Sequence, residues 1–161
     1  MISTELTSSN IARVVELLAD TPRRLDAVSA PFTDEQLRRP LGEGERSATQ
    51  VLAHMINGEA RSSEAIYLAL LADEPFFADI HPEREWGKLL RYDLLAFSEL
   101  RLYFNLRRRV LLRVLASLPE KKWSRVIREE GKQRKESVYW RARTIVMHEL
   151  DHLSELERKL G

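Results

Sequence analysis

The sequence predicts an all-α protein, specifically a four-helix bundle in which one long crossover connection joins two of the helices. Three observations support this prediction. Apolar residues recur every three or four positions over four long stretches, as they do on the buried face of a helix. Serine followed three residues later by glutamine marks a helix start, and proline and glycine fall between the stretches. With 161 residues, of which 43% are apolar, the chain has the size of one domain, which we place at residues 1–161.

The first two helices are predicted from apolar periodicity and from a capping signal. Apolar residues over 11–32 keep to one helical face, and Pro22 is the point at which this helix can bend. Ser47 and Gln50 have the spacing of a capping box, in which each side chain bonds the backbone of the other. The second helix is therefore expected to begin at Ser47 and to run to about residue 72.

The second half of the chain is predicted to contain a long connection and two more helices. Residues 73–91 are rich in proline and glycine and are expected to form the crossover connection, with about one helical turn. A helix over 93–117 follows and is ended by Pro119, and the last helix covers 137–160. The segment between these helices alternates around Val126 and could pair as a small hairpin, but no sheet is predicted.

Composition excludes several classes of protein. The chain contains no cysteine, which rules out disulfides, thiolate metal sites and cysteine nucleophiles. The longest apolar run, Ala65 to Ala72, is far shorter than the roughly 20 residues of a membrane-spanning helix. The N-terminus carries no basic and apolar leader. We therefore expect a cytoplasmic protein without a membrane partner.

Charge is unevenly distributed along the chain: the first half is acidic and the second half is basic. The basic residues of the second half alternate with acidic ones, and no aromatic-studded nucleic-acid motif accompanies them. We interpret them as a solvated helix surface and expect no nucleic-acid partner. These residues are Arg107, Arg108, Arg109, Lys121, Lys122, Arg125, Arg128, Lys132, Arg134 and Lys135.

Three of the four histidines fall on helix faces that are expected to point inward. His148 and His152 are four residues apart, so their imidazoles lie on one face of the last helix. His54 lies about two turns into the second helix, among apolar neighbours, whereas His81 lies in the connection and is expected to be exposed. The spacing is compatible with a three-histidine metal site, and equally with histidines that are hydrogen-bonded in the core.

The segments that carry these histidines resemble a known family. RSATQVLAHMINGEA in the second helix and TIVMHELDHLSELERKL in the last helix are similar to the DinB superfamily, the four-helix proteins that include bacillithiol and mycothiol transferase-like members. The resemblance covers nearly the whole chain. It implies a DinB/YfiT-like bundle in which one divalent metal ion is held by His54, His148 and His152.

Two other metal sites are less consistent with the sequence. HELDH satisfies the H-E-x-x-H pattern of zinc proteases, with Glu149 as general base. Such a protease needs a third ligand downstream and a strand edge for its peptide substrate, and no histidine follows His152. A di-iron centre needs two Glu-x-x-His pairs, whereas Glu149 and His152 form the single pair in the sequence.

Three neutral imidazoles with open coordination positions form a Lewis-acid site that suits zinc, nickel, iron or manganese. The resemblance implies a low-molecular-weight thiol as cosubstrate, which would bring the sulfur that this cysteine-free chain lacks. We expect a metal-dependent enzyme that transfers a small thiol to a small-molecule substrate, or hydrolyses such a substrate. The alternative is a non-catalytic metal-binding or structural bundle that acts in a stress response as an oligomer.

Two residues are candidate helpers in catalysis. Glu149 neighbours a proposed ligand in the sequence and could act as a general base. Arg107 falls within the apolar stripe of its helix, where a buried charge requires a partner. It is expected to form an ion pair with Glu59 or Glu149, or else to clamp a substrate anion.

A second apolar row on the helix over 93–117 predicts an additional contact. A single bundle buries one face of each helix, so these extra residues are expected to contact the 73–91 connection or another subunit. Two-fold symmetry is the commonest solution, and we expect a homodimer. The row consists of Leu95, Leu102, Leu106 and Val110.

Overall fold

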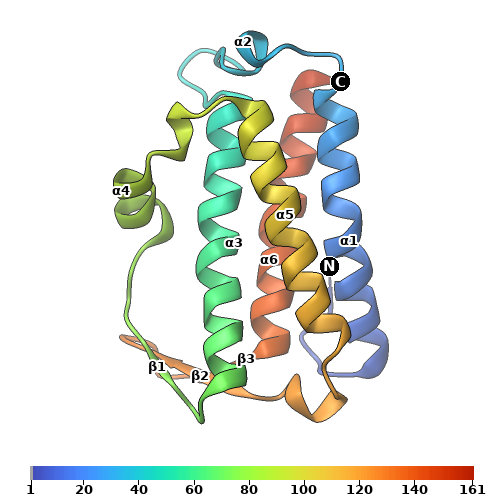
Figure 1. Ribbon diagram of the computed structural model, residues 1–161, viewed down its shortest axis with the longest axis vertical. Helices are drawn as coiled ribbons and strands as arrows, with labels where there is room; N and C mark the ends of the chain where they lie inside the picture. Colours follow the sequence, from blue (N-terminus) through green and yellow to red (C-terminus); the bar gives the residue numbers. More distant parts are fainter. Residues whose placement is uncertain (1) are drawn as a thin grey trace.

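The computed structural model describes residues 2–161 and confirms the four-helix bundle (Figure 1). The four long helices begin and end within a few residues of the predicted positions. They are α1 (Ser8–Ser29), α3 (Ala48–Leu71), α5 (Phe97–Ala116) and α6 (Val138–Leu160).

The connectivity of the bundle explains its long crossover. Helices α1 and α6 run in one direction along the bundle, and α3 and α5 run in the other (Figure 1). Because α3 and α5 are parallel, the chain must return along the full length of the bundle between them. Helix α3 packs against α5 and α6, and α1 packs against the same two helices. The pair α3 and α6 therefore runs side by side and antiparallel.

Hydroxyl side chains cap the N-termini of three of the four long helices. The Oγ1 atom of Thr7 accepts a hydrogen bond from a backbone N–H of α1, and the Oγ atom of Ser137 does the same for α6. At the start of α3, the N–H of Gln50 donates to Ser47 Oγ at 3.2 Å and the N–H of Ser47 donates to Gln50 Oε1 at 2.9 Å. This is the predicted capping box. Helix α1 continues through Pro22 without interruption.

The hydrophobic core extends along the whole bundle in two groups of buried residues. Leu18 and Val146 belong to the group near the sheet, and Leu52 and Phe104 belong to the group at the opposite end. All four side chains are fully buried. This packing fixes the faces of α3 and α6, and therefore the positions of the histidines on them.

A small three-stranded sheet closes one end of the bundle, although no sheet was predicted. Its strands are β1 (Phe76–Phe77), β2 (Val126–Glu129) and β3 (Glu136–Ser137). Strand β2 is parallel to β1 and antiparallel to β3, with Val126 opposite Ser137. The predicted hairpin is thus β2–β3. Strand β1 has two residues and a partner distant in the chain, so it leaves no periodic pattern in the sequence.

The crossover connection contains more secondary structure than the single turn predicted for it. Its helical segments are η1 (Pro82–Gly87), a π-helical segment, α4 (Lys88–Leu90) and η2 (Tyr92–Leu94), of which η1 packs against α3. Two further short segments lie elsewhere, α2 (Asp34–Leu37) and η3 (Glu120–Lys122). The His81 side chain caps η1, because its Nδ1 atom accepts from the N–H groups of Glu83 and Arg84.

One residue of the predicted basic surface is in fact buried. Arg108 is 1% exposed, and its guanidinium donates to the backbone oxygen of Leu18 at 2.8 Å and to the Glu149 carboxylate. The interpretation as solvated surface is wrong for this residue. It lies among alternating charges in the sequence, yet the helical repeat places it on the core face of α5.

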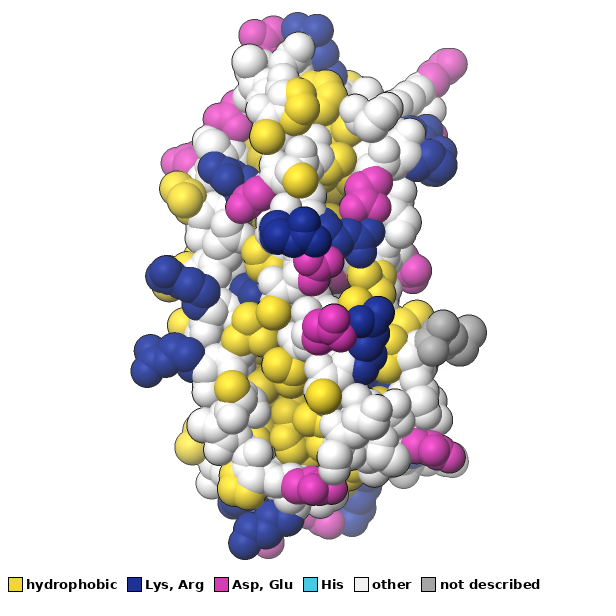
Figure 2. Space-filling model, turned by 90° about the vertical axis from the view of Figure 1, so that its right-hand side faces the viewer, with side chains coloured by type: hydrophobic (Ala, Val, Ile, Leu, Met, Phe, Trp, Pro, Cys, Tyr) yellow, Lys and Arg dark blue, Asp and Glu magenta, His cyan; other side chains and the backbone are white. Residues whose placement is uncertain are grey.

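The second apolar row of α5 is exposed in the monomer. Leu95, Leu102, Leu106 and Val110 are each between 42% and 65% exposed, so the crossover connection does not cover them. On the face of the bundle that includes α1, hydrophobic and charged side chains are interspersed, and no histidine of the described residues is visible (Figure 2). Among residues 2–161, no helix is both long and apolar enough to cross a membrane.

Candidate metal centre

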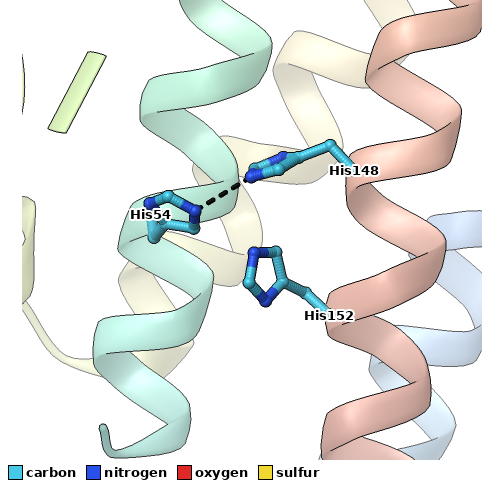
Figure 3. Close-up of side chains that lie close together, drawn as sticks. All are labelled: His54, His148 and His152. Atoms are coloured by element: carbon cyan, nitrogen blue, oxygen red, sulfur yellow. Dashed lines mark hydrogen bonds between the residues drawn. The ribbon is translucent and has the colours of Figure 1, made fainter. Parts of the chain in front are cut away.

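The structure brings together His54 from α3 with His148 and His152 from α6 (Figure 3). One nitrogen of each imidazole lies within 4.8 Å of the corresponding nitrogens of the other two. The Nε2 atoms of His54 and His148 are 2.9 Å apart, and the three ring centroids are 4.7 to 4.8 Å apart. The rings meet edge to face rather than stacking.

A carboxylate lies next to Nδ1 of two of the three imidazoles. Glu83 Oε2 lies 3.0 Å from Nδ1 of His54, and Glu155 Oε2 lies 3.2 Å from Nδ1 of His152. A carboxylate at Nδ1 accepts the proton of the neutral ring and leaves the Nε2 lone pair free. Metal-binding histidines characteristically have such partners, because the second contact fixes both the tautomer and the ring orientation.

Gly58 provides the space for the third imidazole. It lies one helical turn after His54 on α3, and the ring of His148 packs directly on it. A Cβ atom at this position would lie 2.9 Å from Cε1 and 3.2 Å from Nδ1 of His148. These separations are shorter than van der Waals contact, so the ring reaches its place because residue 58 has no side chain.

The surroundings keep the imidazoles of His54 and His148 neutral. Burial, together with the neighbouring His54 and His152, lowers the pKa of His148 to about 4. Burial also lowers the pKa of His54, while the nearby Glu83 carboxylate opposes the shift. At neutral pH these rings are therefore unprotonated, and neutral imidazole is the form that binds metal.

The donor set fits a divalent metal ion. Zinc–nitrogen bonds of about 2.0–2.1 Å place two tetrahedral ligand atoms roughly 3.3 Å apart, close to the 2.9 Å between His54 and His148 Nε2. Three imidazoles satisfy three coordination positions and leave at least one for another ligand, as in catalytic zinc sites. The residues present therefore fit the ion that the sequence resemblance implies.

Two cavities reach the cluster. A cleft of about 730 Å³ lies between α3 and the crossover connection and is lined by His54, Asn57 and Glu83, among others. Its neighbour, of about 420 Å³, is lined by both His54 and His148 and extends toward the β2–β3 hairpin. Asn57 is 4% exposed, and its Oδ1 atom has no hydrogen-bond partner. Small molecules can therefore approach the imidazoles from either side of Glu83.

The structure places Glu149 in the interior of the bundle. Its side chain is fully buried and its carboxylate is bonded to the Arg108 guanidinium. Burial raises the pKa of the Glu149 carboxyl, and the charge of Arg108 opposes this shift. Although Glu149 follows His148 in the chain, the helix directs its side chain to a different face, and it lines neither cavity.

Arg107 forms an ion pair with Glu59, one of the two partners expected for it. Its Nε atom donates to Glu59 Oε2 at 2.5 Å, and its Nη2 atom donates to Ser63 Oγ at 3.1 Å. Glu59 is 2% exposed, and its ion-pair partner is Arg107 rather than an imidazole. These contacts occupy the guanidinium within the wall of the bundle, and Arg107 lines neither cavity.

Sequence reasoning missed three residues around the cluster. Glu155 follows His152 by three positions and so faces the same way along α6, which could have been read from the sequence. Gly58 could have been noticed as a glycine inside a helix, where it costs stability and needs a reason. Glu83 left no signal, since the path of the crossover connection is not encoded in a periodic pattern.

Fold and site together define a helical bundle with a preorganised three-imidazole site between two antiparallel helices. The sequence profile described as DinB superfamily matches residues 17–156, and the chain belongs to this superfamily. The resemblance found in the sequence is thereby confirmed. No curated protein matches the chain.

A solved structure with a similar fold is described as "YfiT from Bacillus subtilis is a probable metal-dependent hydrolase with an unusual four-helix bundle topology". It superposes with a TM-score of 0.82 at 18% sequence identity, over 99% of this chain and 92% of that one. At this level of identity the similarity demonstrates a shared fold.

Proposed function

We propose that the protein is a metal-dependent enzyme that acts on a small molecule, with one divalent ion bound by His54, His148 and His152. The observation that carries this proposal is the clustering of three imidazoles from two helices, two of them with a carboxylate at Nδ1. A purely structural cluster would not need nitrogens of three rings from two helices to lie within 4.8 Å of one another.

The chemistry of the site follows from its donors. A divalent ion bound there supplies Lewis acidity, which lowers the pKa of a water or thiol and polarises a substrate oxygen. The imidazoles contribute no negative charge, so the ion keeps its full electrophilic character. Glu83 and Glu155 orient the rings, and the two cavities admit a substrate.

Water and a small thiol are the two nucleophiles considered for this site. Hydrolysis is supported by the description of the structurally similar YfiT. Thiol transfer is supported by the sequence resemblance to transferase-like members, and in this cysteine-free chain the thiol would come from a cosubstrate. We propose a small-molecule substrate and a homodimer, with no nucleic-acid or membrane partner.

The proposal is tested by metal content and by turnover. Protein purified without a metal-affinity tag is expected to contain one divalent ion per chain, measured by mass spectrometry of the metal. The His54→Ala, His148→Ala and His152→Ala variants are expected to lose the ion and to remain helical by circular dichroism. The His81→Ala variant, whose histidine caps η1 instead, is the matched control and is expected to retain it.

The metal-loaded protein is then assayed with ester and amide substrates in water, and with a small thiol and a generic electrophile. Turnover in one of these assays that disappears in His54→Ala supports the proposed enzyme. The assay that shows turnover identifies the nucleophile as water or the thiol. Full metal content in all three variants would refute the site. Stoichiometric metal without turnover in either assay would favour the non-catalytic alternative.

A further inference from the structure

The smaller cavity beside the imidazoles is lined by three cationic side chains, two of them buried, as well as by two of the proposed metal ligands. His54 and Arg61 are both on α3, and Arg141 and His148 are both on α6. In each helix the arginine is seven residues from the histidine, about 10 Å along the axis, on the side toward the hairpin. The third cation, Lys132, reaches the cavity from the β2–β3 hairpin itself.

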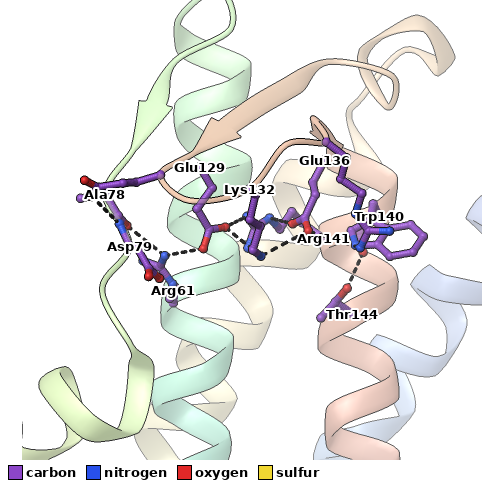
Figure 4. A network of polar contacts seen from close by, with 11 residues as sticks. Arg61, Ala78, Asp79, Glu129, Lys132, Glu136, Trp140, Arg141 and Thr144 are labelled. Carbon is purple, nitrogen blue, oxygen red and sulfur yellow. Dashed lines mark hydrogen bonds and ion pairs between the residues drawn. The ribbon is translucent and has the colours of Figure 1, made fainter.

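These cations form a network with two buried glutamates (Figure 4). Glu129 accepts from Arg61 at 2.9 Å and from Arg141, and it lies 3.1 Å from Lys132 Nζ. Glu136 lies 2.8 Å from Arg141 Nε and 3.3 Å from Lys132 Nζ. Burial opposes ionisation of Glu129, but the three cations prevail and lower the pKa of its carboxyl to about 2. Glu129 is therefore charged at neutral pH.

The positive charges in this network outnumber the negative ones. Arg134 also lies 3.5 Å from Glu136, so four cations share two carboxylates; the side chains of Arg134 and Lys132 are 63% and 42% exposed, whereas Arg61 and Arg141 are buried with the two glutamates. Arg61 is 5% exposed, and its Nη1 atom is buried without a hydrogen-bond partner. A buried guanidinium group with an unbonded N–H group is costly, so the hydrogen bonding of Arg61 is incomplete as it stands.

The other carboxylates that line the cavity do not supply the missing charge. Glu83 contacts His54 at 3.0 Å and lies 3.5 Å from Arg46. Asp79 is exposed, and within residues 2–161 its carboxylate forms no ion pair. Anchoring of the hairpin to α3 and α6 accounts for Glu129 and Glu136, but not for the unbonded Nη1 atom of Arg61.

We propose that this cavity binds an anionic group of the substrate, a carboxylate or a phosphate, next to Arg61, Arg141 and Lys132. The anion would give the free Nη1 of Arg61 a charge-assisted partner and would lie beside the positive charge of Lys132. This proposal rests on the proposed function. It places the reacting bond of the substrate at the proposed metal site and its anionic group up to about 10 Å away along the helices. The substrate class is thus small anionic molecules.

The test uses acetate and inorganic phosphate as probes on metal-free protein, so that no probe can bind to a metal ion. Titration calorimetry at constant ionic strength is expected to show saturable binding of one equivalent, and the tighter of the two probes identifies the source of the anion. Lys132→Gln is expected to weaken this binding about ten-fold, the effect of one charge-assisted contact. Lys135→Gln is the matched control, since Lys135 is on the same hairpin and pairs with Glu74 at 2.7 Å.

Absence of saturable binding up to about 10 mM of either probe would overturn the anion site, as would equal weakening in both lysine variants. Arg61→Lys provides a second variant that keeps the charge and loses the planar fork, and it is expected to bind the probes more weakly than wild type. Zinc binding is measured on the same samples. Anion binding without zinc binding would refute the proposed function and leave this site standing, and the reverse result would refute this site alone.

Discussion

Replacement of Gly58 by alanine would test whether the space at this position is what admits the His148 imidazole. The new Cβ would lie 2.9 Å from Cε1 of the ring, whereas carbon atoms in contact are at least about 3.5 Å apart. The ring must therefore move by roughly 0.6 Å, because 3.5 Å minus 2.9 Å is 0.6 Å. Metal–ligand distances tolerate changes of only about 0.2 Å, so the ring is pushed out of coordinating position.

The expected result is a loss of metal affinity without a loss of fold. Alanine is favoured over glycine inside a helix by about 1 kcal/mol, which opposes whatever the contact with the ring costs. Displacement of one ligand is expected to lower zinc affinity about 10- to 100-fold, or roughly 1.4 to 2.7 kcal/mol. Competition with a chromophoric chelator measures the affinity, and circular dichroism with a thermal melt measures the fold.

Ser62→Ala is the control, because it introduces the same side chain one turn further along α3. Its zinc affinity is expected to equal that of the unsubstituted protein. If Gly58→Ala also binds zinc with unchanged affinity, the close approach of His148 to α3 does not determine its coordinating position, and the steric reasoning fails. A loss of helicity in Gly58→Ala would likewise contradict it.

Three further predictions concern the core, the pH dependence and the assembly. Glu149→Ala leaves the Arg108 charge buried and unpaired, so urea unfolding is expected to show that the free energy of unfolding falls by about 3–5 kcal/mol. The zinc content of this variant is expected to be unchanged. A stable variant without activity would instead make Glu149 a catalytic base. The pKa of His148 is about 4 in the folded protein against about 6.5 in the unfolded chain, so the unfolded chain binds a proton that the folded protein does not. The free energy of unfolding of the metal-free protein is therefore expected to fall by about 3 kcal/mol between pH 6.5 and 4, and to fall less in His148→Gln. Identical pH profiles for the two proteins would refute this assignment. Light scattering coupled to size exclusion is expected to give a dimer that Leu106→Glu weakens while zinc binding is retained, and a mass near 18.7 kDa for the unsubstituted protein would rule the dimer out.

The sequence predicts the bundle well because its helices are long and strongly periodic. The capping box at Ser47 is formed as predicted, and α6 begins one residue after the expected position. The proximity of His54 to His148 follows from the packing of α3 on α6, and in the sequence it was supported by family resemblance rather than by spacing alone. The burial of Arg108 was missed because a run of three arginines masks the helical repeat beneath it.

Features that depend on contacts between distant segments were not predictable. The approach of Glu83 to His54 requires the path of the crossover connection, which short irregular helices define. The network around Glu129 requires the hairpin to fold back over α3 and α6, and the pairing of β1 with β2 joins segments about 50 residues apart. Alternating charges in this region resemble an exposed surface in the sequence, although Glu129, Glu136 and Arg141 are buried.

The imidazoles and the cavity walls belong to different segments of the chain, which has a consequence for how the protein can diversify. The three imidazoles are carried by α3 and α6, whose packing against the rest of the bundle determines the stability of the domain. The walls of both cavities are completed by the crossover connection and the hairpin, which contribute little to the core. Mutations at Lys132, or in η1 at positions other than Glu83, are therefore expected to change which molecules enter without disturbing the proposed coordination geometry or the folding of the chain. A single metal-binding scaffold can in this way acquire new substrates by drift in its two most tolerant segments.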